Sequence, residues 1–415
     1  MNLHFARYVD RWIGLAVCFG LWLAGRVAGA IRGRRVVPPL LATTPPAPAA
    51  VPRSPRRVLA IKFYGLGNIA MILPTLQAMR DGGDCEIDFL TLPGNRELLQ
   101  RSGLVRRALT VEVGGYASFL SSVGRLLGAL RAGRYDAVID FEQFMKLSGV
   151  FAFLTGAGVR VGFNTEGQAR GWLYTHRIAY ADTDHMADIF MRVAQPFGRA
   201  VVPAPRVRVA VSAEDRERAL RHAGIADGGP LVAMHMGTGP NYNKIALKRW
   251  DARRFGALAD ALIERWGARV AFTGQGVEEA SLIEDALAGM RHRSGALSLC
   301  DRLDVSELLA LLDACELVVS NDTSVMHLAG LVETPVVAFF GPTEPRLYGP
   351  RGPNDLVFYK GLYCSPCLSN YNLKMSRCVD PVCMREITLA EVIAGVEARF
   401  GSSARAAPGE RAAGF

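Results

Sequence analysis

One segment constrains the fold of this chain more than any other: Leu317–Gly341, LVVSNDTSVMHLAGLVETPVVAFFG. It contains two apolar runs, Leu317–Ser320 and Pro335–Phe340, whose Val, Leu and Phe residues are typical of parallel strands buried on both faces. Between them, after Asn321-Asp322, the residues have the composition of a short helix. The segment therefore predicts a strand–helix–strand unit within an open α/β sheet.

The start of that helix predicts an anion-binding site. Thr323 and Ser324 occupy the N-cap region, so free backbone N–H groups and the positive end of the helix dipole point toward the end of the first strand. In open α/β sheets an anion, most often a phosphate, binds at this position. Asp322 is an acceptor for a sugar hydroxyl, and His327 follows one turn along the helix. The simpler interpretation is an ordinary helix cap with a solvated aspartate.

A second phosphate-binding feature lies upstream, after the predicted strand Leu231–Met236. The strand leads into the turn Gly237-Thr238-Gly239-Pro240, and Lys244, Lys248 and Arg249 follow shortly afterwards. Backbone amides of a Gly/Thr turn, with cations beside them, suit a diphosphate. A solvated basic surface is the alternative interpretation of these cations.

The first half of the chain opens in a similar way. A predicted strand, Val58–Phe63, is followed by the turn Gly65-Leu66-Gly67-Asn68 and an apolar helix, Ile69–Met79. Such a turn brings backbone N–H groups close to a ligand. Neither GxGxxG after the first strand nor GxxxxGK[ST] is present, so a dinucleotide-dependent oxidoreductase and a P-loop enzyme are not supported.

Alternating strand-like and helical runs continue through both halves. We therefore predict an α/β fold of two Rossmann-like, doubly wound domains facing a cleft. A Pro-Ala-Pro sequence at 203–205 marks the crossing between them. The predicted parts are an apolar and basic membrane-associating helix, a Pro-rich linker, an N-terminal domain, a C-terminal domain with a Cys-rich loop at 363–384, and a tail, over residues 1–35, 36–56, 57–203, 204–401 and 402–415.

The positive charge of the chain is concentrated near its N-terminus. The net charge is +9, but the first 80 residues hold eleven Lys and Arg and one acidic residue, so the remainder is close to neutral. This placement argues against a nucleic-acid-binding groove. Residues 1–35 combine an apolar run with flanking arginines, which suits an interfacial helix on an anionic membrane surface. A one-pass anchor and a helix packed on the protein itself are the alternatives.

Four of the eight cysteines lie close together near the C-terminus. Cys364, Cys367, Cys378 and Cys383 form CSPC-x10-C-x4-C, a spacing found in metal sites, although the second pair is wider than usual. A structural zinc, reduced thiols in a packed loop, and disulfides are the three interpretations. Disulfides are disfavoured if the body of the protein is cytoplasmic.

Three stretches together carry a resemblance to a known family. IKFYGLGNIAMILPTL, HMGTGPNYNKIALKRW and VVSNDTSVMHLAGLVETPVVAFFGPTEPRLYGP resemble, in this order, glycosyltransferase family 9, the ADP-heptose:lipopolysaccharide heptosyltransferases. The resemblance covers residues 57–397 and implies an inverting GT-B enzyme with an N-terminal acceptor domain and a C-terminal nucleotide-sugar domain. It implies transfer of a sugar, heptose from ADP-heptose in the first place, to a lipopolysaccharide core or similar glycolipid at the cytoplasmic face of the inner membrane.

The resemblance also implies which residues act. Asn68, Asp322 and Lys248 match catalytic positions, with Lys248 as the cationic partner of the donor diphosphate. No metal is obligatory, because helix N-termini and Lys248 can stabilise the leaving diphosphate. A Glu after the Gly-Gln-Gly turn, Glu278 or Glu279, matches a nucleoside ligand. The implied substrate-binding residues are Gly65, Gly67, Gly237, Thr238, Gly239, Lys244, Glu278, Thr323, Ser324, Val325 and His327.

One position departs from the family pattern. Well-known members carry an Asp, the proposed general base, where this chain has Asn68, and an amide cannot take up a proton at neutral pH. Asn68 can still orient the acceptor while another carboxylate, such as Asp140 or Glu142 at a strand end, serves as base. The competing hypotheses are a family member that uses a different nucleotide sugar, and a catalytically silent protein that binds a nucleotide sugar as a scaffold.

Overall fold

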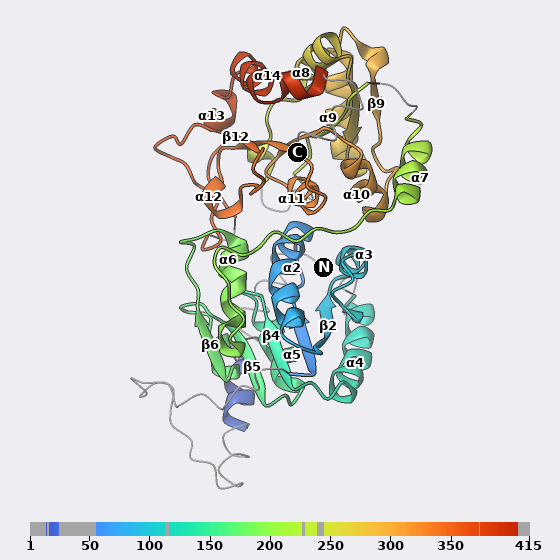
Figure 1. Cartoon of the computed structure of the whole chain (residues 1–415). Helices are drawn as coiled ribbons and strands as arrows, with labels where there is room; N and C mark the ends of the chain where they lie inside the picture. The colour runs from blue at the N-terminus through green and yellow to red at the C-terminus, as the bar shows by residue number, and fades with distance from the viewer. Residues whose placement is uncertain are drawn as a thin grey trace. The chain divides into compact units, whose positions relative to one another are not determined.

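The computed structural model describes residues 14, 16–24, 55–112, 116–225, 229–238, 245–372 and 374–405. These residues form two compact units, which divide between Val207 and Arg208. Each unit is built on a parallel six-stranded sheet. Helices flank each sheet (Figure 1). The prediction of two doubly wound α/β domains is confirmed at this level.

Both sheets have the strand order of a Rossmann fold. The first runs β3-β2-β1-β4-β5-β6 and the second β12-β11-β10-β7-β8-β9, and all neighbouring strands are parallel. In the first sheet the strands are β1 (Arg57–Ile61), β2 (Glu86–Thr91), β3 (Arg107–Thr110), β4 (Ala137–Asp140), β5 (Val159–Asn164) and β6 (His176–Ala179). In the second they are β7 (Leu231–His235), β8 (Arg269–Thr273), β9 (Ala296–Ser298), β10 (Leu317–Asn321), β11 (Val336–Phe340) and β12 (Leu356–Tyr359).

Helices connect the strands on both faces of each sheet. The first unit has α2 (Leu66–Asp81), α3 (Arg96–Arg101), α4 (Tyr116–Ala132), α5 (Lys146–Leu154) and α6 (Met186–Met191), with short 3-10 turns η1 (Pro93–Asn95), η2 (Arg170–Leu173) and η3 (Arg192–Phe197). The second has α7 (Ala213–Ala223), α8 (Ala252–Trp266), α9 (Gly276–Ala288), α10 (Val305–Asp313), α11 (Ser324–Leu331), α12 (Pro345–Tyr348), α13 (Val382–Arg385) and α14 (Leu389–Arg405), with η4 (Ile245–Lys248) and η5 (Arg293–Gly295).

This strand order fixes where a ligand can approach each sheet. In a doubly wound sheet the order in which strands are added reverses at one point. The loops that follow the two central strands diverge at this point and leave a crevice. In the first unit these strands are β1 and β4, and in the second they are β7 and β10. The turns singled out from the sequence, at Gly65–Asn68, Gly237–Gly239 and Asp322–Ser324, all follow one of these four strands.

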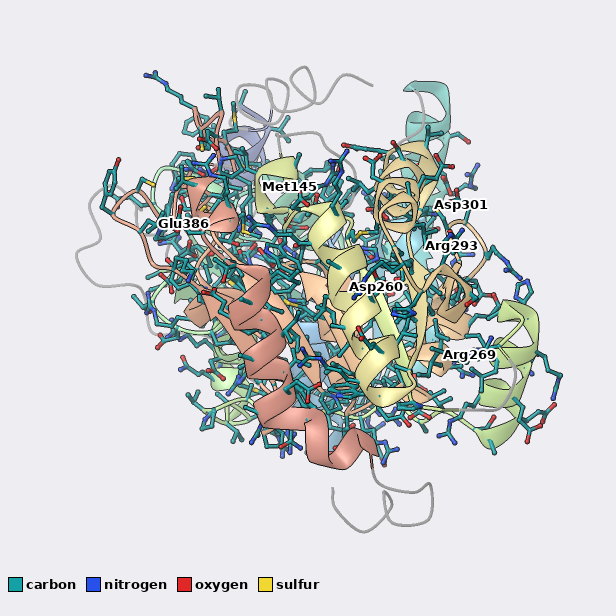
Figure 2. The ribbon with its side chains drawn as sticks, turned by 90° about the horizontal axis from the view of Figure 1, so that it is seen from above. Met145, Asp260, Arg269, Arg293, Asp301 and Glu386 are labelled. Atoms are coloured by element: carbon teal, nitrogen blue, oxygen red, sulfur yellow. The ribbon has the colours of Figure 1, made fainter. Side chains whose placement is uncertain are left out.

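The second unit has a large aromatic core next to its crevice. Trp250 is buried and stacks on Phe339 of β11, with ring centroids 4.4 Å apart, and its indole N–H donates to the Ile387 carbonyl at 2.8 Å. On the neighbouring helix α8, the buried carboxylate of Asp260 accepts the backbone N–H groups of Arg291 and His292, at 2.9 and 2.8 Å (Figure 2). The Trp250 contacts hold the end of β11, whereas the Asp260 contacts hold the connection from α9 to β9.

The N-terminal segment, predicted to associate with a membrane, is described only in part. Residues 14 and 16–24 are helical, whereas the rest of residues 1–35 and nearly all of the Pro-rich linker lie outside the described residues. Within the described chain no helix is both long and apolar enough to cross a bilayer. Phe19 and Trp22 pack on Trp172 of the first unit, each with ring centroids 6.3 Å away. The described part of this helix therefore contacts the first unit, and its association with a membrane surface stays a prediction.

Candidate active site

The best-formed cluster of polar groups lies at the end of β10 in the second unit. The carboxylate of Asp322 is buried and accepts the ammonium of Lys248 at 2.7 Å and the hydroxyl of Thr343 at 2.7 Å, both on Oδ2. Lys248 also donates to the Asp322 carbonyl at 3.1 Å. Burial raises the pKa of Asp322, but Lys248, followed by Lys374 and Thr343, outweighs burial and holds the pKa below its ordinary value. The side chain is therefore ionised at neutral pH and holds Lys248 in place.

Helix α11 begins directly beside this ion pair. Thr323 is its N-cap, and the Thr323 hydroxyl accepts the N–H of Val325 at 3.2 Å. Ser324 is the first helical residue, and His327 follows one turn later, partly buried. The structure thus brings the predicted cation, the predicted carboxylate and a helix N-terminus together. Of these, the cation and the N-terminal N–H groups are suited to contact an anion.

Asn321 is a structural residue that the sequence did not single out. It is fully buried, and its side-chain N–H donates to the Met236 carbonyl at 2.8 Å. Its side-chain oxygen accepts the backbone N–H of Trp250 at 2.9 Å. Asn321 therefore ties β10 to the end of β7 and to the segment that carries Lys248. Thr343, at the end of β11, was missed as well, although GPT directly after a buried strand is a signal for such a position.

The turn after β7 is positioned by two glutamates with different surroundings. Gly237 has no room for a Cβ, because that atom would lie 1.9 Å from Oε1 of Glu279, which is buried. Glu278 is half-exposed and pairs with Arg249 at 2.8 Å, and Arg249 donates to the Thr238 hydroxyl at 3.2 Å. Glu279 thus packs under the turn, while Glu278 lies at its rim. Gly239 and Lys244 lie outside the described residues.

In the first unit, the predicted turn connects β1 to α2. Gly65 has φ +91°, a conformation that favours glycine, and a Cβ there would lie 2.6 Å from the amide nitrogen of Asn68. Asn68 donates from this nitrogen to the Tyr64 carbonyl at 3.2 Å and is partly exposed. Gly67 is buried at the start of α2. The turn therefore holds the Asn68 amide in one orientation at the sheet edge.

The suggested alternative bases, Asp140 and Glu142, are not placed for that role. Asp140 is fully buried, with one oxygen accepting the Glu142 N–H at 2.9 Å and the other accepting Arg170 at 2.7 Å and the Tyr174 hydroxyl at 2.6 Å. The Glu142 oxygens accept the Phe63 N–H at 2.8 Å and Lys62 at 2.9 Å. All four oxygens are engaged within the fold, so this hypothesis needs correction.

The four cysteines of the C-terminal loop are free thiols in the structure. Burial, followed by the thiols of Cys367, Cys364 and Cys378, raises the pKa of Cys383 to about 11. As placed, they do not fit a metal centre, because no group of three or more His, Cys, Asp or Glu among the described residues is arranged to hold an ion.

A structural zinc at this loop stays a prediction. Elemental analysis of protein purified without added metal decides between zinc and free thiols. In either case we expect the loop to be structural, so a chelator should leave turnover unchanged. If chelation abolishes turnover while circular dichroism shows an intact fold, the structural role is wrong.

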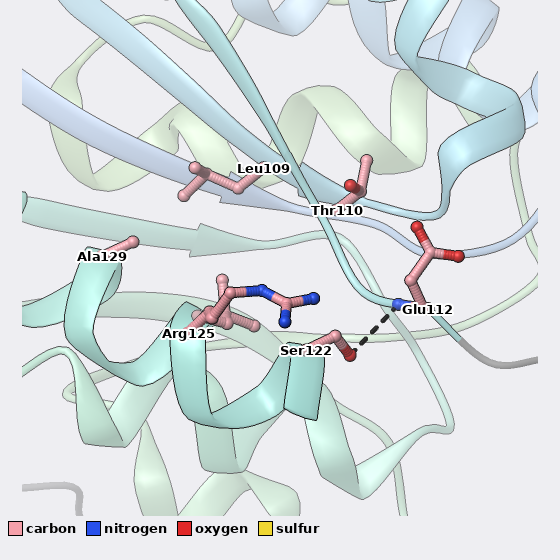
Figure 3. Close-up of a pocket in the computed structure, with 7 residues that line it drawn as sticks. Leu109, Thr110, Glu112, Ser122, Arg125 and Ala129 are labelled. Carbon is pink, nitrogen blue, oxygen red and sulfur yellow. Dashed lines mark hydrogen bonds between the residues drawn. The ribbon is translucent and has the colours of Figure 1, made fainter. Parts of the chain in front are cut away.

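A small cavity lies away from these residues, between β3 and α4 of the first unit (Figure 3). Its volume is about 210 Å³, and Thr110, Glu112, Ser122 and Arg125 provide its polar groups. The N–H of Glu112 donates to the Ser122 hydroxyl at 3.3 Å. No residue proposed from the sequence lines this cavity.

The described chain thus has two Rossmann-type units, one of which carries a Lys–Asp pair beside a helix N-terminus at its switch point, as the resemblance to a GT-B glycosyltransferase predicts. Comparisons with known proteins agree. Residues 123–375 match the model of glycosyltransferase family 9 (heptosyltransferase). This chain therefore belongs to glycosyltransferase family 9, the heptosyltransferase family.

Individual relatives have low sequence identity to this chain, but the matches cover most of its length. The chain is 27% identical to lipooligosaccharide heptosyltransferase 2 of Haemophilus influenzae over 64% of this chain and 78% of that protein. It is 26% identical to lipopolysaccharide heptosyltransferase 1 of Pseudomonas aeruginosa over 75% of this chain and 86% of that protein. The solved structure of Escherichia coli ADP-heptose LPS heptosyltransferase II has the same fold, with a TM-score of 0.68, 19% identity, and coverage of 83% of this chain and 99% of that one.

Proposed function

We propose that this protein transfers heptose from ADP-heptose to a lipopolysaccharide-type glycolipid with inversion at the anomeric carbon. The observation that carries the proposal is the buried Lys248–Asp322 pair beside the N-terminus of α11. A diphosphate leaving group gains negative charge as the glycosidic bond breaks, and fixed cations and N–H groups stabilise that charge. The relatives named for ADP-heptose and lipopolysaccharide support this donor and this acceptor.

A donor panel tests the proposal directly. Purified protein is incubated with ADP-heptose and with hexose and hexosamine donors carrying ADP, UDP or GDP, together with a truncated lipopolysaccharide acceptor, and the free nucleoside diphosphate is measured. We expect acceptor-dependent release from ADP-heptose alone. Release from another donor would assign a different sugar. Donor binding without release from any donor would instead support the scaffold hypothesis.

Asn68 is proposed to orient the acceptor hydroxyl rather than to take its proton. Replacing Asn68 with alanine should lower turnover and raise the KM for the acceptor, while ADP binding to the second unit is unchanged. Asn68→Asp should keep or raise activity and add a carboxylate-dependent limb to the pH–rate profile, because a proton acceptor then stands at this turn. If Asn68→Ala has no effect on turnover with any accepted substrate pair, the turn only connects β1 to α2.

We further propose that the N-terminal helix holds the protein at the cytoplasmic face of the inner membrane. Val17, Phe19 and Leu23 are exposed apolar residues on the described part of this helix, with exposed fractions of 38, 49 and 47%. Deleting residues 1–50 should move the protein from the membrane to the soluble fraction while donor binding is retained, because the donor groups lie in the other unit. A truncated protein that stays entirely in the membrane fraction would show that the anchor lies elsewhere.

A further inference from the structure

In the first unit, the chain continues beyond the end of β1 before it reaches the turn that carries Asn68. The strand ends at Ile61, and the backbone N–H of Lys62 donates to the Leu90 carbonyl of β2 at 3.1 Å. The backbone of the next residue, Phe63, bonds to side chains instead of to a neighbouring strand. This residue lies at the switch point of the sheet, where the two neighbours of β1 diverge.

Two buried side chains hold the backbone of Phe63 from opposite sides. Its N–H donates to Oε1 of Glu142 at 2.8 Å, and its carbonyl accepts Nδ2 of Asn95 at 2.8 Å. Glu142 follows β4 and Asn95 follows β2, the two strands that flank β1. The two side chains therefore extend the hydrogen-bond ladder by one residue beyond the point where the strands end.

Asn95 occupies the N-cap position of α3, but its side chain does not cap that helix. Asn is favoured at such positions because its side-chain oxygen can accept an N–H group of the first turn. Within α3, all of whose residues are described, no such bond is present. The side-chain nitrogen donates a second bond instead, to the Thr91 hydroxyl at 2.8 Å. The buried amide of Asn95 thus serves the segment after β1 and not its own helix.

The residue that Asn95 holds directly precedes the group that orients Asn68. Tyr64 follows Phe63, and its carbonyl accepts the side-chain nitrogen of Asn68 at 3.2 Å. Gly65 then turns the chain with φ +91°. Because the Phe63 carbonyl belongs to the peptide that leads into Tyr64, a rotation of this peptide would move the Tyr64 carbonyl and the Asn68 amide with it.

We propose that Asn95 is a positioning residue for the acceptor site. By holding the Phe63 carbonyl, it fixes the orientation in which the Asn68 amide meets the acceptor hydroxyl. This inference rests on the proposed function, since it names a further residue for the same acceptor. Asn95 is buried, so it acts through the turn and not by contact with the acceptor.

Transfer kinetics of the full chain, with ADP-heptose and a truncated lipopolysaccharide acceptor, test the inference. Asn95→Ala should lower kcat/KM for the acceptor by roughly ten- to a hundredfold, because a displacement of about 1 Å in an orienting group has an effect of this order. The affinity for ADP, measured by calorimetry, should be unchanged, since the donor groups lie in the other unit.

A double-mutant cycle separates positioning from a purely structural role. In the Asn68→Ala background, Asn95→Ala should cause no further loss of kcat/KM, because the amide that it orients is already gone. Losses that multiply would show that Asn95 does not act through Asn68, and this result would contradict the inference.

Variants of Thr91 apply the same test if Asn95→Ala does not fold. Thr91→Val removes the hydroxyl that accepts the second N–H of Asn95, so it should lower kcat/KM in the same direction by a smaller factor. Thr91→Ser keeps a hydroxyl at this position and should keep the activity.

Asp136→Ala is the matched control at the other end of β1. The Asp136 carboxylate accepts the backbone N–H groups of Arg56 and Arg57, both at 2.9 Å, so it also holds the backbone of this strand through a side chain. Its removal loosens the strand away from the turn. It should therefore leave kcat/KM per folded molecule unchanged.

The outcomes distinguish this inference from the proposed function. If Asn68→Ala lowers kcat/KM but neither Asn95→Ala nor Thr91→Val does, the inference is wrong and the proposed function stands. If Asn68→Ala itself has no effect, the turn does not orient the acceptor and the inference is wrong as well. If the unaltered protein transfers sugar from no donor, both are overturned.

Discussion

Replacing Lys248 with alanine should weaken binding of the nucleotide sugar by roughly ten- to a hundredfold and lower turnover by a further factor of about 10²–10³. The first loss follows from removing a charged hydrogen bond to the diphosphate. The second follows because Lys248 stabilises a charge that grows as the leaving group departs. The ammonium is largely buried and held 2.7 Å from Asp322.

Lys360→Ala provides the matched control for this variant. Lys360 lies in the same unit and also forms a 2.7 Å ion pair, with Glu391, but both partners are about one third exposed. Its removal should change neither affinity nor turnover. Calorimetry with the donor and single-turnover kinetics separate the two effects on Lys248→Ala. Unchanged donor affinity in this variant would show that the diphosphate binds elsewhere.

Replacing Asp140 with alanine should destabilise the first unit by about 3–5 kcal/mol, a large part of the stability of a typical domain. The carboxylate pairs with Arg170 at 2.7 Å, and both side chains are fully buried. Removing it leaves the guanidinium buried without a counter-charge. Denaturant unfolding of the variant measures the effect, and turnover per folded molecule separates it from a catalytic role.

Two further variants test the physical reason for this loss. Glu86→Ala removes a carboxylate from a half-exposed pair with Arg57 in the same sheet and should cost about 0–1 kcal/mol. Adding Arg170→Met to Asp140→Ala should recover part of the stability, because the unpaired charge is then gone. If Asp140→Ala is as stable as the unaltered protein but inactive, Asp140 acts in catalysis and the structural assignment fails.

The sequence predicted the parts of this protein that depend on local pattern. The segments expected as strands at 317–320 and 335–340 are β10 and β11, because continuous runs of Val, Leu and Phe have few other stable arrangements in a large domain. The glycine turns at Gly65 and Gly237 were found for a similar reason. Where a turn approaches another group closely there is no room for a Cβ, so the position requires glycine. Glycine at such a position can be recognised in the sequence.

Contacts between residues distant in sequence could not be predicted in the same way. Asp140 is the last residue of a strand, where a catalytic carboxylate is also expected, but its partner Arg170 lies 30 residues further along the chain. The residues next to a carboxylate in the sequence do not show whether it is buried against such a partner or faces a ligand. Thr343 contacts Asp322 across 21 residues, and Tyr348 meets Lys374 through the loop, so both contacts depend on how β11 and the Cys-rich loop pack.

The most direct test of the central claim is the mass and anomeric configuration of the product. A heptose-free lipopolysaccharide acceptor or its truncated analogue is incubated with ADP-heptose and the full chain, and the glycolipid is analysed by mass spectrometry and NMR. The account predicts an acceptor that gains one heptose, with the anomeric configuration opposite to that in the donor, and an equal amount of ADP. A product with retained configuration, or ADP released with no heptose on the acceptor, would contradict it.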